Sequence, residues 1–80
     1  MVRGKGWLTV KPGNLVQPTV GNLQIFDSVN PLGMFTSTFP QDHIGIIIDS
    51  CYSPSDVPYI KIITGESIGW VRYERVKVIR

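Results

Sequence analysis

The side chains of this sequence that could do chemistry are few, and their spacing matches no familiar reaction centre. There is one histidine, His43, and one cysteine, Cys51. A zinc site needs three or four such ligands at short, regular spacings, and none is present. The serines Ser50, Ser53 and Ser55 lack the strand–turn–helix context of a hydrolase nucleophile. We therefore expect no catalytic residue, no metal ligand and no cofactor site.

The carboxylates lead to the same expectation. General acid–base catalysis usually requires two carboxyl groups that share a cleft and differ in pKa. The acidic residues of this chain are dispersed and form no recognisable pair: Asp27, Asp42, Asp49, Asp56, Glu66 and Glu74. We predict that the protein is not an enzyme and has no small-molecule substrate.

Basic residues gather between positions 61 and 80, close to the aromatic residues Trp70 and Tyr73. Cations beside a stacking ring are how small barrels hold single-stranded nucleic acid. Glu66 and Glu74 are interspersed, however, and opposite charges on paired strands are also typical of an ordinary solvated sheet. Three alternatives stay open: a solvated barrel face, a surface for an acidic patch on a protein partner, or a nucleic-acid-binding surface formed by Lys61, Trp70, Arg72, Arg75 and Lys77.

The segment "NPLGMFTSTF", residues 30–39, is apolar and uncharged. If its side chains are exposed, they form a patch for a protein partner or for a second copy of the chain. If they fold back, Phe39 and its neighbours plug one end of a small barrel. For the first alternative, the expected partner-binding residues are Leu32, Met34, Phe35, Trp70, Arg72 and Arg75.

The elements that must position these side chains are strands. Eight glycines and six prolines punctuate short segments rich in Val, Ile, Thr, Tyr and Trp, and no stretch has helical periodicity. "KPGN", residues 11–14, is typical of a turn, because Pro12 fixes φ and Gly13 accepts a positive φ. A short strand is expected on each side of this turn, at 8–10 and from residue 15. Residues 17–43 predict a long irregular loop with one weak strand at 23–26.

The clearest strand pattern is "HIGIIIDS", residues 43–50. It places Ile44, Ile46 and Ile48 on one face and Ile47 on the other, beside Gly45. Because the run is β-branched on both faces, it predicts a central strand that is covered on most sides.

The rest of the chain predicts a hairpin and a closing strand. "YIKIIT" alternates, with Ile60, Ile62 and Thr64 on one face, and "GES" turns the chain at Gly65. "IGWVRY" returns, "ERV" forms a single helical turn and "KVI" a final strand. The expected structural side chains of this closing stretch are Ile68, Val71, Val76 and Ile79.

Two of these stretches carry a family resemblance. "KPGNLV" at 11–16 resembles the "x-x-G-D-L-V" opening of SH3-like barrels, and "GWVRYERVKVI" at 69–79 resembles their closing motif, "G-[YFW]-[VIF]-P-x-x-Y-V-x-x-I". The plan is also similar to Tudor and KOW barrels and to small proteins of tailed bacteriophages. The resemblance implies an all-β, SH3-like barrel of five to six strands with a long first loop. It also implies that Val71 points into the core and Trp70 to the surface.

The departures from the family bear on function. At the positions where peptide-binding SH3 domains keep the Pro and Tyr of their groove, this chain has Arg72 and Arg75. A proline-rich ligand needs several aromatic walls, so such a ligand is not expected. The aromatic residues needed for a Tudor-type cage are scattered. The resemblance therefore implies a non-enzymatic interaction or structural module, plausibly phage-encoded, with a nucleic-acid-binding KOW-type barrel as the alternative.

Length and charge set the remaining limits. Eighty residues with a net charge of +2 predict one domain over 1–80, with 1–7 as a flexible arm, and give weak support for nucleic acid. No apolar run is long enough to span a membrane, and the start lacks the apolar region of a signal peptide. One cysteine fits a reducing compartment. We expect a protein of a host cytoplasm or of a virion, not secreted by a signal peptide, with a protein partner or self-association.

Overall fold

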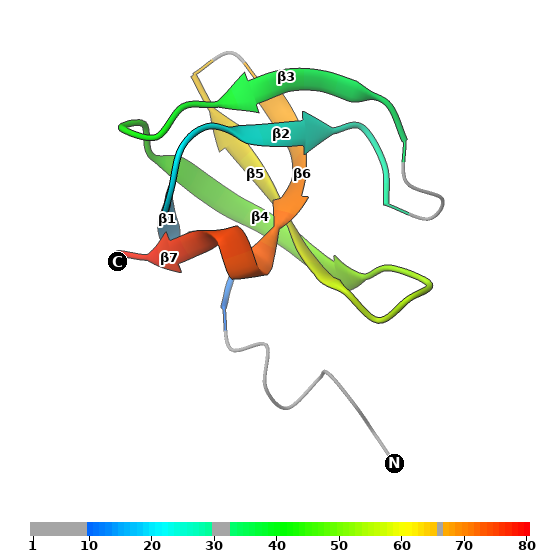
Figure 1. The fold of residues 1–80 in the computed structure, drawn as a ribbon. Helices are drawn as coiled ribbons and strands as arrows, with labels where there is room; N and C mark the ends of the chain where they lie inside the picture. Colours follow the sequence, from blue (N-terminus) through cyan, green and yellow to red (C-terminus); the bar gives the residue numbers. More distant parts are fainter. Residues whose placement is uncertain (1–9, 30–32, 66) are drawn as a thin grey trace.

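The molecule is built from strands and one helical turn. The computed structural model describes residues 10–29, 33–65 and 67–80 (Figure 1). The strands are β1 (Leu15–Pro18), β2 (Leu23–Phe26), β3 (Phe35–Phe39), β4 (Gly45–Tyr52), β5 (Pro58–Thr64), β6 (Ser67–Arg72) and β7 (Val76–Val78), with a 3₁₀ turn η1 (Tyr73–Arg75) before β7. The prediction of an all-β chain is confirmed for these residues.

All the strands belong to one antiparallel sheet with the order β3-β2-β6-β5-β4-β1-β7. The sheet curls on itself into a half-barrel, with the β2–β3 hairpin at one end and β7 and η1 at the other (Figure 1). The sheet formed by the described residues has 7 strands, whereas the sequence predicts five or six. Among the described residues, no helix is long and apolar enough to cross a membrane.

The additional strand lies inside the segment that was expected to be a loop. Residues 17–43 contain β2 and β3, which pair from Leu23 opposite Phe39 to Phe26 opposite Phe35. β3 is difficult to find in the sequence because "FTSTF" has its apolar residues only at its ends and lacks a clear alternation. The strand expected at 8–10 falls outside the described residues except for Val10, which is not in a strand.

The core lies on the inner face of the curled sheet. Ile60 and Ile62 share one face as predicted and are fully buried, and Val71 points inward as predicted. Thr64 is also buried, and its hydroxyl donates to Ile44 O at 3.1 Å. The buried cluster comprises Val16, Leu23, Ile25, Phe39, Ile47, Ile60, Ile62, Val71 and Val76.

The orientation of β4 reverses one prediction. Ile47 is 1% exposed, whereas Ile44, Ile46 and Ile48 are 48%, 44% and 36% exposed. Gly45 explains the choice of face, because a Cβ at this position would lie 3.0 Å from Ile62 Cδ1 and 3.2 Å from Phe39 Cζ. Ile62 and Phe39 already fill the space beside Gly45, so this position has no room for a side chain. The face of β4 that carries Gly45 and Ile47 therefore points into the core. The three other isoleucines face outward, and β4 is not covered on most sides.

The closing stretch also differs in part from its prediction. Val71 and Val76 are buried, but Ile68 and Ile79 are 53% and 40% exposed and do not close the core. The helical turn covers Tyr73–Arg75, one residue earlier than "ERV". After this turn the chain enters β7, which pairs with β1, so the last strand lies beside the first.

Candidate binding surface

The register of the sheet arranges the outward-facing side chains in rows that cross several strands. Directly opposed residues of antiparallel strands project from the same face. Ile47 and Ile62 oppose one another in the core, so their neighbours Ile46 and Ile63, which also oppose one another, project outward. The outer face can therefore be followed residue by residue from the pairing.

The first row is aliphatic. Ile46 lies opposite Leu15 on one side and Ile63 on the other, and Ile63 lies opposite Ile68. Leu15 is partly buried, while Ile46, Ile63 and Ile68 are 44%, 41% and 53% exposed. We call these four residues the aliphatic row. They join β1, β4, β5 and β6 in one uncharged band.

The second row is aromatic and runs beside the first. Lys61 lies opposite Trp70, Trp70 opposite Phe26, and Phe26 opposite Phe35. Lys61 Nζ is 5.8 Å from the centroid of the Trp70 ring, within the range of a cation–π contact. On the other side of Lys61, the row continues to Asp49 of β4. Trp70 faces outward as predicted, but it is only partly exposed.

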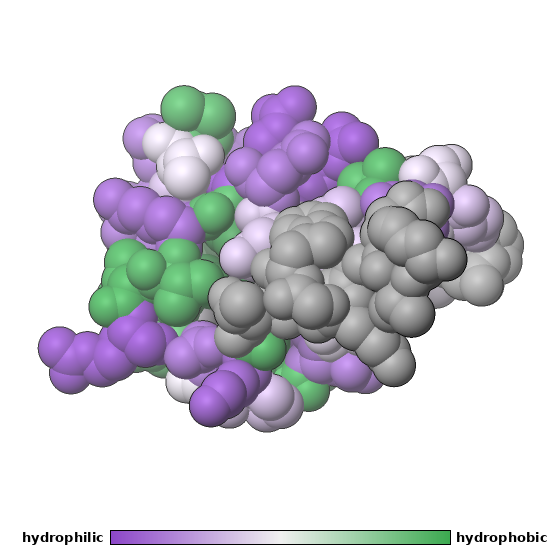
Figure 2. Space-filling model, turned by 90° about the horizontal axis from the view of Figure 1, so that it is seen from below, coloured by the Kyte–Doolittle hydropathy of each residue, from purple (hydrophilic) through white to green (hydrophobic). Residues whose placement is uncertain are grey.

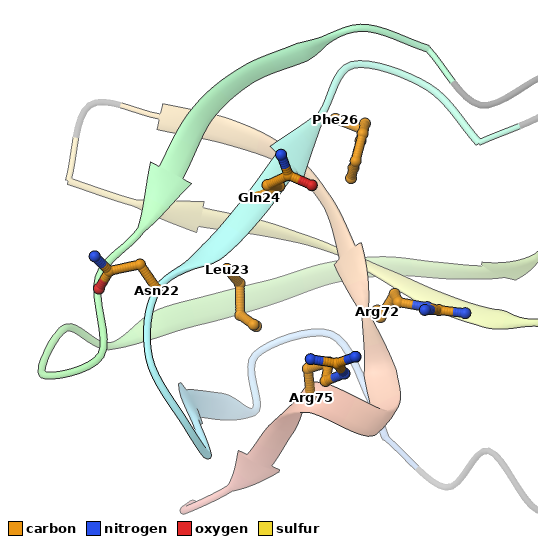
Figure 3. A pocket seen from close by; sticks show the side chains of 6 residues that line it. All are labelled: Asn22, Leu23, Gln24, Phe26, Arg72 and Arg75. Atoms are coloured by element: carbon orange, nitrogen blue, oxygen red, sulfur yellow. The ribbon is translucent and has the colours of Figure 1, made fainter.

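A hollow of about 290 Å³ lies between β2 and the end of β6 with its 3₁₀ turn (Figure 3). Arg72 is the last residue of β6, and Arg75 is the last residue of η1. Arg72 precedes the turn with an extended backbone and Arg75 ends the turn, and both line the same hollow. We call it the arginine hollow; its lining residues are Asn22, Leu23, Gln24, Phe26, Arg72 and Arg75.

The 3₁₀ turn that carries Arg75 is held to the β1–β2 connection. Thr19 donates twice to Arg75 O, from its backbone N at 2.9 Å and from Oγ1 at 3.2 Å. The side chain of Arg75 is exposed. Arg72 Nε lies 3.8 Å from Glu74 Oε2, a long contact between two exposed groups that contributes little to stability.

A second hollow, of about 390 Å³, shares Arg72 with the first. It is bordered by the β4–β5 connection and by Val29. Its lining is mainly apolar or hydroxylic: Val29, Ser53, Pro54, Ser55, Val57, Tyr59 and Arg72.

The residues predicted to bind a partner are divided between these features. Met34 and Phe35 are 71% and 53% exposed, whereas Phe39 is fully buried, so the apolar segment both exposes a patch and fills the core. Leu32 lies outside the described residues. Of the nucleic-acid alternative, Lys61 and Trp70 are in direct contact, and both arginines line one hollow. Lys77 lies on β7 and lines neither hollow.

Cys51 lies in an environment that changes the pKa of its thiol. Burial raises the pKa of the Cys51 thiol above its ordinary value, and the charge of Asp49 raises it further. His43 is exposed, and its backbone N donates to Pro40 O at 3.1 Å. Within 10–29, 33–65 and 67–80, no three His, Cys, Asp or Glu side chains are grouped so as to hold a metal ion.

Sequence reasoning missed the aliphatic row and four of the six residues that line the arginine hollow. Ile46 was expected in a covered strand and Ile68 in the closure of the barrel, because burial cannot be read from an all-apolar strand pattern. Gln24 and Phe26 enter the hollow through the pairing of β2 with β6. The pair of arginines three residues apart around a helical turn was the available signal.

The comparisons with known proteins add no assignment. No protein-family model, no curated protein and no solved structure matches this chain.

Proposed function

We propose that this chain is an SH3-like barrel that serves as a non-enzymatic protein-interaction module and associates with a second copy of itself through the aliphatic row. The observation that carries the proposal is the exposure of Ile46, Ile63 and Ile68, which lie directly opposite one another on adjacent strands. Figure 2 shows one face of the molecule, on which hydrophobic residues occur as patches between hydrophilic ones. A contiguous apolar surface of this kind is typical of an interface.

The physical chemistry of the row favours association. Burial of apolar surface stabilises a complex by about 25 cal/mol per Å². Isoleucine is stiff at χ1, so ordering these side chains in an interface costs little rotamer entropy. The strands also hold the side chains in fixed positions, which lowers the cost of association further.

The charges beside the row favour a second copy as the partner. Asp49 lies opposite Lys61 in the neighbouring row, so one acid and one base border the apolar band. In a twofold dimer the same patch is present on both subunits, and residue i of one contacts residue j of the other. A band bordered by both charge signs is therefore self-complementary, whereas a band bordered by one sign would repel its copy.

Analytical ultracentrifugation tests the proposal. We expect the wild-type chain to sediment as a monomer at low concentration and with the mass of a dimer as the concentration rises. Ile63→Lys should remain monomeric, because it places a charge in the middle of the row. Val20→Lys is the matched control, since Val20 is 60% exposed but lies outside the sheet; this variant should associate like the wild type.

Two outcomes would overturn self-association. One is a wild-type chain that stays monomeric at millimolar concentration; the other is Ile63→Lys that associates as strongly as Val20→Lys. Circular dichroism of both variants tests whether they are folded. A second substitution, Ile68→Thr, retains a β-branched residue and should weaken association without introducing a charge.

A further inference from the structure

β3 lies at an open edge of the sheet. It is the first strand in the strand order, so it pairs with β2 on one side only. Figure 1 shows it along the rim of the curled sheet, with no strand beyond it among the described residues. The backbone N–H and C=O groups along the free side of an edge strand form a template for another strand. This edge can therefore accept a further strand.

The two edges of the sheet differ in how they are protected. β7, at the other edge, has three residues, and Lys77 is exposed at its centre. Short edge strands and exposed lysines prevent other chains from pairing. β3 has five residues with the sequence FTSTF, without a charge or a proline. A register shift leaves Thr36 without an opposite residue on β2, but pairing is regular from Ser37 to Phe39. β3 is therefore the less protected edge.

The sequence of β3 is complementary to itself. FTSTF reads the same in both directions, with Ser37 at its centre. If two copies pair antiparallel about a twofold axis at Ser37, the two serines lie opposite one another, and Thr36 of each copy lies opposite Thr38 of the other. Opposed threonines and serines are favourable cross-strand pairs. A twofold contact uses the same patch on both copies, and β3 provides such a patch.

Ser37 also has a polar group that this pairing would satisfy. Ser37 lies opposite Ile25, which is fully buried, so the serine faces inward. Its Oγ is buried and has no hydrogen-bond partner among the described residues. Buried hydroxyl groups are nearly always hydrogen-bonded, and an added strand would bring a second serine hydroxyl to this position.

The space beside this part of β3 is open. A hollow of about 280 Å³ lies there, and its lining residues are uncharged: Thr36, Ser37, Ser67 and Ile68. No charge among these residues opposes the approach of an uncharged strand.

We propose that β3 pairs edge to edge with β3 of a second copy, antiparallel and about a twofold axis at Ser37. The contact is distinct from the aliphatic row, which it meets only at Ile68, and it does not depend on association through that row. A single pair of short strands is marginally stable in water, so this contact is transient between isolated chains.

Disulfide trapping tests both the pairing and its register, because it captures transient contacts. One chain carries Thr36→Cys and the other Thr38→Cys, at two positions that are exposed. Both chains also carry Cys51→Ala, which removes the natural thiol, and Ile63→Lys, which blocks the aliphatic row. One of them is labelled with ¹⁵N. Equal amounts are mixed and treated with oxidised glutathione, and mass spectrometry distinguishes the mixed dimer from the two homodimers.

The proposed register favours the mixed dimer. Its two cysteines lie directly opposite, with Cβ atoms about 4.5–5.5 Å apart, whereas those of a homodimer are diagonal neighbours at about 7–8 Å. We expect the mixed dimer to form about tenfold faster than either homodimer, because a disulfide spans the larger separation only if the backbone moves. Ser37→Cys is a second reporter, since at the twofold axis it should link to its own copy as fast as the mixed pair.

Val20→Cys in place of Thr38→Cys is the matched control, because Val20 is 60% exposed but lies outside the sheet. The mixed dimer should then form in the statistical proportion. Circular dichroism before oxidation tests whether each variant is folded.

Three results contradict the proposal. The first is a statistical proportion of the mixed Thr36→Cys and Thr38→Cys dimer. The second is faster formation of the homodimers, which indicates parallel or shifted pairing. The third is trapping no faster than in the Val20→Cys control. The aliphatic row is blocked in every sample, so these results leave the test of the row by sedimentation unaffected.

Discussion

Gly69 of β6 lies so close to Ile25 of β2 that no side chain fits between them. A Cβ on Gly69 would lie 2.7 Å from Phe26 O, and closer still to Ile25 Cγ2. The contact allows β2 to pair with β6 at Phe26 and Trp70. We expect Gly69→Ala to lower the free energy of unfolding by about 1–3 kcal/mol, since the backbone of β2 must move. Urea denaturation measures this change.

Gly45→Ala is the matched control for that substitution. Its Cβ would lie 3.0 Å from Ile62 Cδ1, the flexible end of a side chain rather than backbone. We expect a smaller loss of stability than for Gly69→Ala. If Gly45→Ala lowered the free energy of unfolding as much as Gly69→Ala or more, the contact between Gly69 and the backbone of β2 would not be the tighter of the two contacts.

The opposite orientation of two consecutive isoleucines gives a second prediction. Ile47 is 1% exposed and Ile46 is 44% exposed. Ile47→Ala should lower the free energy of unfolding by about 2–5 kcal/mol, because it leaves a cavity in the core. Ile46→Ala should cost less than about 1.5 kcal/mol when measured at concentrations where the chain is monomeric. A similar decrease in the free energy of unfolding for both variants would contradict the inward orientation of Ile47 and the outward orientation of Ile46.

A third prediction concerns Asn14, which joins the first turn to the end of the chain. Asn14 Oδ1 accepts from Lys11 N at 2.7 Å, and Nδ2 donates to Arg80 O at 3.1 Å. Asn14→Ala removes both bonds and should reduce stability by about 1–2 kcal/mol. Hydrogen exchange should accelerate at Ile79, whose backbone N donates to Leu15 O. Unchanged exchange at Ile79 would argue against this connection.

A fourth prediction follows from the raised pKa of Cys51, caused by burial and by Asp49. At pH values between the ordinary thiol value of 9.0 and the raised one, the unfolded chain has lost a proton that the folded chain keeps. The free energy of unfolding therefore falls as pH rises through this window, and the contribution is fully present below it. Cys51→Ala should make this fall less steep in urea titrations from pH 7 to 10.

Alkylation of the same thiol gives an independent check. Asp49→Asn should accelerate the reaction of Cys51 with iodoacetamide at pH 8, since a lower pKa increases the thiolate fraction. The increase should be modest, because burial is the larger cause of the shift. A reaction rate that does not change would remove Asp49 as a contributor.

Much of this fold can be predicted from the sequence because the residues of several turns allow only one local backbone conformation. "KPGN" forms its turn, with Gly13 at a φ of 99° and Asn14 N bonded to Lys11 O. The hairpin of β5 and β6 turns at Gly65, whose φ is 55°. What escaped prediction depends on tertiary contacts. The burial of β4 is decided by Phe39 and Ile62 against Gly45, and no local pattern contains that information.

The candidate sites likewise combine features that local sequence fixes with features that depend on tertiary contacts. Arg72 and Arg75 were predicted as partner-binding residues, but the hollow that they share depends on how the turn between them folds. Phe26 reaches them only because β2 pairs with β6, and Val57 is brought near Arg72 by the β4–β5 connection. Ile63 and Ile68 face each other in the hairpin, but their exposure follows from the absence of any covering element among the described residues.

The position of β1 between β4 and β7 bears on the order in which the chain folds. Both neighbours of β1 come much later in the sequence, and the bond from Asn14 to Arg80 spans 66 positions. During synthesis, β1 must remain unpaired until β4 has been made, and its other edge remains open until β7 follows. The hairpins of β4, β5 and β6 are local, and local contacts form fastest. We expect these three strands to form first, and the earliest strand of the chain to join them last.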